Sequence, residues 1–161
     1  MKASKIFIFI SILFFYSNAS SIPESIRGYY KCRLIGIEKY LDGEESEIKN
    51  FEDDTSLPFD KALIIDKNKL TFLRFANVNT GEIISKTIFN YSGFNEMYKG
   101  DCGSYYFKPK LSAFRINQAW LNCLNVFSIM YSGTTEKFID GIVKEVPEEK
   151  YMHYKCLKSQ N

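Results

Sequence analysis

The triplet Tyr-Lys-Cys occurs near both ends of the chain and constrains the fold more than any other feature. It occupies residues 30–32 and again residues 154–156. In a β-strand, residues two apart lie on the same face, so each triplet places a tyrosine and a cysteine together and a lysine opposite them. If the first and last strands are neighbours, Cys32 can reach Cys156, and the sheet then closes on itself.

The chain has four cysteines, which are Cys32, Cys102, Cys123 and Cys156. An even number in a small exported protein is typical of two disulfides, and three pairings are possible in principle. The triplets favour Cys32 with Cys156, which leaves Cys102 with Cys123. The spacings contain neither Cys-x-x-Cys nor a cysteine-histidine pattern, and the chain has one histidine, so no metal site is expected.

The N-terminus is typical of an export signal. Two lysines precede an apolar run at 6–15, and small residues follow as far as Ala19 and Ser21. This pattern predicts a signal peptide at 1–19, with cleavage after residue 19 or 21, and a secreted or periplasmic protein. An uncleaved anchor is the alternative, but the run is shorter than the roughly 20 residues that span a bilayer. No later stretch is long and apolar enough for a transmembrane helix.

The charge of the exported chain gives no support for a nucleic-acid partner. Losing Lys2 and Lys5 with the signal leaves 19 basic and 19 acidic residues. A nucleic-acid-binding or membrane-binding protein of this kind would be strongly basic. The acidic residues gather at 42–60, which we expect to be a solvated loop. A calcium site or a surface for a basic partner is the alternative, although the segment lacks the pattern of an EF-hand loop.

Residues 20–161 are expected to form a single β-rich domain. Pro23 and Gly28 bracket one short helical turn, and helical periodicity is hard to find beyond it. Turn-rich pieces at 77–81, 92–95 and 132–135 separate runs rich in aromatic and β-branched residues. The pattern predicts an antiparallel up-and-down barrel of about eight strands, stapled by disulfides, with a two-sheet sandwich as the alternative. The expected strands are 29–40, 62–66, 70–75, 82–91, 105–108, 111–116, 120–131, 137–146 and 151–157.

The start of this domain resembles that of lipocalins and their calycin relatives. Those exported barrels have a short helical turn followed by Gly-x-Trp on the first strand. Here residues 23–27 precede Gly28-Tyr29-Tyr30, so Tyr30 stands where the family has tryptophan. The resemblance implies a barrel that binds a small apolar ligand.

The expected strand at 120–131 bears most directly on a binding site. Apolar side chains occur on both of its faces, whereas a half-exposed antiparallel strand alternates more cleanly. A central strand covered on both sides is one interpretation, and an apolar cavity or partner surface on one face is the other. The candidate lining residues are Tyr30, Trp120, Leu124 and Met130.

The sequence gives little support for an enzyme. Its single histidine, His153, would have to serve any hydrolytic triad, and it lies on the strand face opposite Tyr154 and Cys156. The adjacent carboxylates at 53–54 and 148–149 fall in polar segments, where such pairs are seldom catalytic. No phosphate-binding loop, dinucleotide fingerprint or nucleophile elbow is present, so no cofactor is expected.

These observations predict an exported, non-enzymatic protein that binds a small hydrophobic ligand. The alternative is a secreted interaction module, such as an inhibitor, adhesin or effector. That module would use the 42–60 segment or an exposed aromatic face to capture a protein partner. Asn90 begins a glycosylation sequon, which matters only in a eukaryotic host.

Overall fold

The computed structural model describes residues 21–51, 54–95, 103–111 and 115–160. The predicted signal peptide and Cys102 therefore lie outside the described residues. Within these ranges, no helix has the length and apolar character needed to cross a membrane. The elements are a 3-10 turn and nine strands: η1 (Glu24–Ile26), β1 (Gly28–Leu41), β2 (Glu44–Asn50), β3 (Lys61–Ile65), β4 (Lys69–Asn77), β5 (Glu82–Asn95), β6 (Ser104–Pro109), β7 (Ile116–Asn122), β8 (Val126–Ile139) and β9 (Ile142–Lys158).

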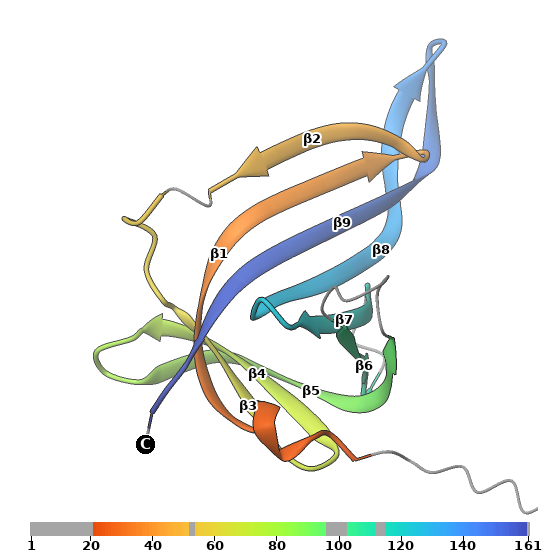
Figure 1. The fold of residues 1–161 in the computed structure, drawn as a ribbon. Helices are drawn as coiled ribbons and strands as arrows, with labels where there is room; N and C mark the ends of the chain where they lie inside the picture. The colour runs from red at the N-terminus through yellow and green to blue at the C-terminus, as the bar shows by residue number, and fades with distance from the viewer. Residues whose placement is uncertain (1–20, 52–53, 96–102, 112–114, 161) are drawn as a thin grey trace, which may run out of the picture.

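The strands form a closed antiparallel up-and-down barrel, as the sequence predicts. From β3 to β9 each strand pairs with the next, and β9 pairs back onto β1 along most of its length. Residues 28–32 of β1 pair with β3, and residues 36–41 of β1 pair with β2. Eight strands therefore close the barrel, and β2 extends the sheet on one side, where β1, β2, β8 and β9 arch together (Figure 1).

The predicted disulfide between Cys32 and Cys156 is confirmed. The two residues are direct partners in the β1–β9 ladder, with their Cα atoms 4.1 Å apart. Both side chains are fully buried, and the bond ties the first strand to the last. No free cysteine occurs among the described residues, and Cys123 is disulfide-bonded. The pairing of Cys123 with Cys102 stays a prediction because Cys102 is not described.

The interpretation of 42–60 as a continuous acidic loop is wrong. Glu44–Asn50 forms β2, which pairs with residues 36–41 of β1. The connecting turn is Asp42-Gly43, where both residues have positive φ, at 56° and 80°. That is the backbone of a two-residue hairpin turn, for which Asp-Gly is a preferred sequence. Glu44, Glu45 and Glu47 therefore lie on this strand rather than in a loop.

The expected strand at 120–131 is two strands. β7 ends at Asn122 and β8 begins at Val126. The side-chain oxygen of Asn122 accepts hydrogen bonds from the backbone N–H groups of Leu124 and Val126, each at 3.0 Å. Asn125 adopts a positive φ of 58°. Asparagine favours turns both by accepting backbone hydrogen bonds with its side chain and by tolerating a positive φ. The apolar residues next to Asn122 and Asn125 made this turn look like a continuous strand in the sequence.

The end of the barrel also differs from the sequence interpretation. Residues 132–135, expected to be a turn, continue β8, and residues 147–149, expected to be a break, lie within β9. The true turn is Asp140-Gly141, with φ of 53° and 81°. The resulting β8–β9 hairpin projects well beyond the barrel (Figure 1). Of the strand expected at 111–116, the structure describes residues 111, 115 and 116. Among these, only Ile116 lies in a strand, at the start of β7.

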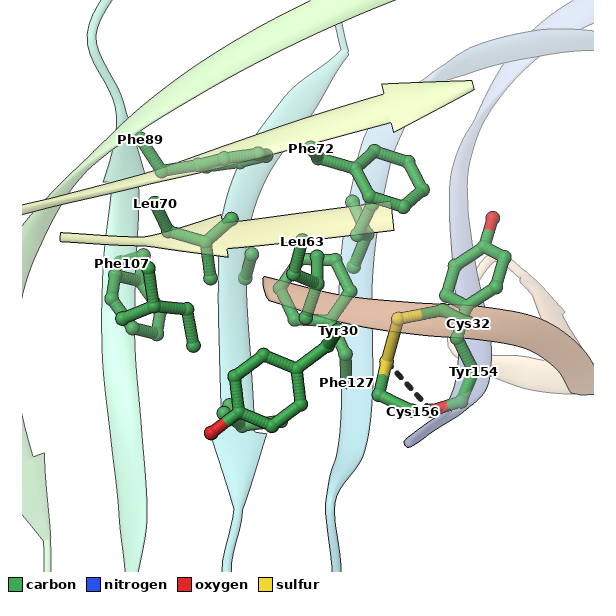
Figure 2. Close-up of a cluster of buried hydrophobic side chains, with 14 of the residues drawn as sticks. Tyr30, Cys32, Leu63, Leu70, Phe72, Phe89, Phe107, Phe127, Tyr154 and Cys156 are labelled. Atoms are coloured by element: carbon green, nitrogen blue, oxygen red, sulfur yellow. Dashed lines mark hydrogen bonds between the residues drawn. A yellow bond between two sulfur atoms is a disulfide. The ribbon is translucent and has the colours of Figure 1, made fainter. Parts of the chain in front are cut away.

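The centre of the barrel is filled by aromatic side chains (Figure 2). The rings of Phe72 and Phe127 have centroids 5.4 Å apart, and Tyr154 lies 5.4 Å from Phe72 and 6.3 Å from Phe127. Phe89 adds a fourth ring at 6.4 Å from Phe127. Large, fully buried side chains of this kind contribute much of a domain's stability.

The N-terminal segment closes one end of the barrel. Ile22 is fully buried in the core, and its carbonyl accepts two hydrogen bonds from the Arg27 guanidinium, at 2.9 and 2.7 Å. The Tyr30 hydroxyl donates to the carbonyl of Ile26 at 2.8 Å. Lys158, at the end of β9, reaches the carbonyl of Ser25 at this same end. The opposite end of the barrel is the one from which the β8–β9 hairpin projects (Figure 1).

Candidate functional site

A cavity of about 260 Å³ lies at this opposite end, the barrel mouth. On β9, Tyr154 belongs to the core and Met152 packs against it. Side chains alternate between faces, so Lys150 and Glu148 continue the interior face toward the mouth. The cavity is lined by β4, by Arg115 before β7, and by β8 and β9: Arg74, Arg115, Tyr131, Ser132, Glu148, Lys150 and Met152.

The floor of the mouth is apolar and its rim is charged. Tyr131 and Met152 pack against the core below the cavity. Burial raises the pKa of the Tyr131 phenol, so its hydroxyl stays neutral and available as a donor. Above this floor stand two arginines and a lysine with a single carboxylate, that of Glu148. The mouth therefore combines apolar surface with an excess of positive charge.

Glu148 is held by cations on both sides. Its Oε1 lies 2.8 Å from the Lys39 Nζ, and its Oε2 lies 3.5 Å from Arg115 Nη1. The hydrogen bond from Lys39 holds the pKa of the Glu148 carboxyl below its ordinary value of 4.5, and the charges of Lys39, Arg115 and Lys150 act in the same direction. The carboxylate thus neutralises part of the rim without leaving it acidic.

Arg115 reaches Glu148 because the residue between them is glycine. Gly133 on β8 is the ladder partner of Glu148 on β9. A Cβ atom at Gly133 would lie 3.0 Å from the Arg115 Nε and 3.3 Å from its Cδ. The guanidinium therefore crosses β8 over Gly133, and it also donates a hydrogen bond to the Thr134 carbonyl at 3.2 Å. A larger residue at position 133 would push this cation away from the mouth.

Arg74 and Lys150 are the cations of the mouth that form no ion pair within the described residues, although the charge of Lys150 acts on Glu148. Neither side chain has an ion pair or hydrogen bond within the described part of the chain. Arg74 is exposed on the β4 side of the cavity, and Lys150 is partly buried on the β9 side. An anion held between them would complete a charge arrangement that the protein itself leaves unbalanced.

We expect the Glu148→Gln variant to lose the part of the protein's stability that depends on this carboxylate. Because the folded-state pKa is depressed, the ionised carboxylate stabilises the protein above the unfolded-state pKa. That contribution is lost as pH falls through the folded-state pKa, below about 4.5. The expected loss at neutral pH is about 1 kcal/mol or less, since the pair is partly solvated.

Urea unfolding between neutral and strongly acid pH measures this effect. The variant should be less stable at neutral pH, and the difference from the native chain should shrink toward the acid end. Glu82→Gln, which removes an exposed carboxylate from β5, controls for the change in net charge. A constant difference at every pH would contradict the linkage.

The four lining candidates predicted from the sequence do not meet at one site. Tyr30 is buried in the core with 2% of its surface exposed. Trp120 and Met130 alternate with the core residues Ala119, Leu121 and Ile129, so both lie on the outer face of the barrel. Leu124 lies in the β7–β8 turn and is 62% exposed. The interior faces of β7 and β8 are therefore opposite to the faces that carry Trp120 and Met130.

His153 forms a polar contact on the outer face. Its Nδ1 lies 2.8 Å from the Ser128 hydroxyl, and its Nε2 lies 3.4 Å from the Glu38 carboxylate. The three residue types are those of a hydrolytic triad, but Ser128 is only 2% exposed. A substrate cannot approach a hydroxyl buried to this degree, so the arrangement does not supply an accessible nucleophile.

The carboxylate candidates are similarly separated. Glu148 lies on the interior face of β9 and Glu149 on the outer face, because adjacent strand residues point to opposite sides. Of the other pair, Asp53 lies outside the described residues, and Asp54 accepts hydrogen bonds from Ser56. No cluster of three or more histidine, cysteine, aspartate or glutamate side chains suited to a metal ion occurs in the described ranges.

Comparison with known proteins returned no match for this chain among protein-family models, curated proteins or solved structures. The barrel architecture is compatible with a lipocalin-like protein.

Proposed function

We propose that the protein is an exported, non-enzymatic carrier of the lipocalin-like type that binds a small amphipathic anion at the barrel mouth. The ligand we infer is an organic carboxylate with a short apolar chain. The single observation that carries this proposal is the mouth cavity, which joins an apolar floor to a rim with excess positive charge.

The charges of the rim support an anion. Arg74 and Lys150 lack ion-pair partners within the described ranges, and Arg115 is held at the rim by its path over Gly133. A carboxylate can accept two parallel hydrogen bonds from an arginine, and such charge-assisted bonds are stronger than neutral ones. The charged head of the ligand would therefore lie between β4 and β9.

The size and depth of the cavity limit the ligand. Its volume of about 260 Å³ falls near the lower limit for small-molecule sites. Below it, the rings of Phe72, Phe127 and Tyr154 fill the barrel. The apolar chain would therefore rest on Tyr131 and Met152 rather than enter the centre. This favours short-chain amphiphiles over long lipids.

Titration calorimetry of the disulfide-intact protein with octanoate tests the proposal. We expect binding that weakens as salt is added, and weaker binding of octanol, which has the same chain and no charge. Arg74→Gln and Lys150→Gln should each lower the affinity for octanoate by about tenfold, since each removes a charge-assisted contact.

Lys86→Gln is the matched control. Lys86 is an exposed lysine on β5, outside the residues that line the mouth. Its replacement lowers the net charge of the protein by the same amount and should leave octanoate affinity unchanged. Equal affinity for octanol and octanoate, or an equal effect of Lys86→Gln, would overturn the assignment of an anion to the mouth.

A further inference from the structure

A second cavity lies on the outer face of the same strands whose inner face forms the mouth. It measures about 230 Å³ and is lined by the upper part of β1, the β1–β2 turn and β9: Glu38, Tyr40, Gly43, Pro147, Glu149 and Tyr151. In the β1–β9 ladder, Glu38 is opposite Tyr151 and Tyr40 is opposite Glu149. Adjacent strand residues point to opposite faces, so these side chains lie outside while Lys39 and Lys150 turn inward.

Aromatic rings form the walls of this second cavity, which we call the outer cage. The rings of Tyr40 and Tyr151 have centroids 5.8 Å apart and stand nearly perpendicular, at 89°. Trp120 packs against Tyr151 from β7, with centroids 6.3 Å apart at 67°. Trp120 in turn contacts Tyr106 on β6 at 6.5 Å. The two tyrosines of the cage are thus supported from one side by a continuous aromatic stripe.

Carboxylates give the cage a negative charge. The Tyr40 hydroxyl donates a hydrogen bond to Glu38 Oε2 at 3.2 Å, and the Tyr151 hydroxyl donates to Glu149 Oε2 at 2.8 Å. Burial, followed by the hydrogen bond and charge of Glu149, raises the pKa of Tyr151 to about 12. The charge of Glu38 is the largest cause of a raised pKa at Tyr40. Among the described residues that line this cavity there is no lysine or arginine.

We propose that the outer cage binds a small organic cation of the quaternary-ammonium type, such as a choline group. Perpendicular aromatic rings attract a cation through their electron-rich faces. Glu38 and Glu149 supply the compensating charge, and each uses one oxygen to accept a tyrosine hydroxyl. A quaternary ammonium has no N–H to donate, so it requires charge and aromatic surface rather than free acceptors. The site is independent of the anion proposed for the mouth.

The fluorescence of Trp120 provides a direct readout. It is the only tryptophan in the chain, and its ring contacts Tyr151. Titration with choline chloride should shift its emission, whereas sodium chloride at the same ionic strength should not. The uncharged carbon analogue 3,3-dimethyl-1-butanol has the same shape as choline and should bind at least about tenfold more weakly.

Variants separate the cage from the stripe behind it. Tyr151→Leu and Tyr40→Leu should each reduce choline affinity about tenfold or more by calorimetry. Tyr40→Phe keeps the ring and should retain most of the binding even if Tyr40→Leu perturbs the strand. Tyr106→Leu is the matched control, because Tyr106 contacts Trp120 without lining the cavity. Equal binding of choline and its uncharged analogue, or no binding of either, would overturn the proposal.

The source of the choline group is decided by a further arm of the same experiment. Sedimentation with phosphatidylcholine vesicles, reversed by added choline, would assign the site to a lipid headgroup. Choline binding without vesicle capture would assign it to a free small cation. Octanoate titration of the Tyr151→Leu variant should be unchanged, which distinguishes failure of this site from failure of the mouth.

Discussion

Replacing both Cys32 and Cys156 by alanine is expected to lower the free energy of unfolding by about 4–5 kcal/mol. The two cysteines are 124 residues apart, so their bond closes a long loop of the unfolded chain and removes much of its conformational freedom. Both side chains are fully buried, and alanine keeps the site apolar. Urea unfolding followed by Trp120 fluorescence and by circular dichroism measures the loss.

The variant should still form the barrel under native conditions. The β1–β9 ladder continues for many residues beyond the cysteines, so its backbone hydrogen bonds should still hold the two strands together. Adding a reductant to the double variant reports separately on the remaining cysteines. A loss below about 1 kcal/mol would show that the bond does little to restrict the unfolded chain.

The closure of the barrel could be predicted because it depends on one local pattern repeated at both ends. The Tyr-Lys-Cys triplets fix the face of each cysteine, and neighbouring first and last strands would bring the two cysteines within reach of each other. Cys32 and Cys156 are indeed opposite each other, and Tyr30 and Tyr154 are both buried in the core. The alternation of side chains along a strand predicts the face of each cysteine even when the other strands are not known.

The strand boundaries were less predictable because turn chemistry was hidden or misread. Asp42-Gly43 and Asp140-Gly141 are both tight hairpin turns, yet the first was absorbed into an acidic segment and the second into an expected strand. The residue types at 132–135 favour a turn, and Pro147 with the two glutamates after it favours a break between strands at 147–149. These residues lie instead in the long β8 and β9, where cross-strand pairing overrides local preference.

The mouth could not be found from the sequence because its residues come from distant strands. Arg74 on β4 and Lys150 on β9 meet only after the barrel closes. One signal was available: counting back by twos from Cys156 along an unbroken strand places Lys150 and Glu148 on the interior face. The expected break at 147–149 interrupted that count. The same error hid the outer cage, since Glu149 and Tyr151 occupy the alternate positions of the same strand.

Phe127→Ala is expected to destabilise the protein by about 3–5 kcal/mol, because truncating a buried phenylalanine loses apolar contacts and leaves a cavity. Phe127 is fully buried at the centre of the barrel, where its ring meets those of Phe72, Phe89 and Tyr154. Urea unfolding again gives the difference. Phe138→Ala is the matched control on the same strand, since Phe138 is 72% exposed. Its effect should stay within about 0.5 kcal/mol.

The same variant tests whether the barrel interior is a binding site. If Phe127 is close-packed, its loss lowers stability, and the native interior has no room for a ligand below the mouth. A loss below about 1 kcal/mol would mean that the centre is loosely packed. Long-chain carboxylates should then bind the native protein more tightly than octanoate, because their chains would pass beyond Tyr131 and Met152. We expect the opposite order in the native chain, because its aromatic core sets the depth of the mouth.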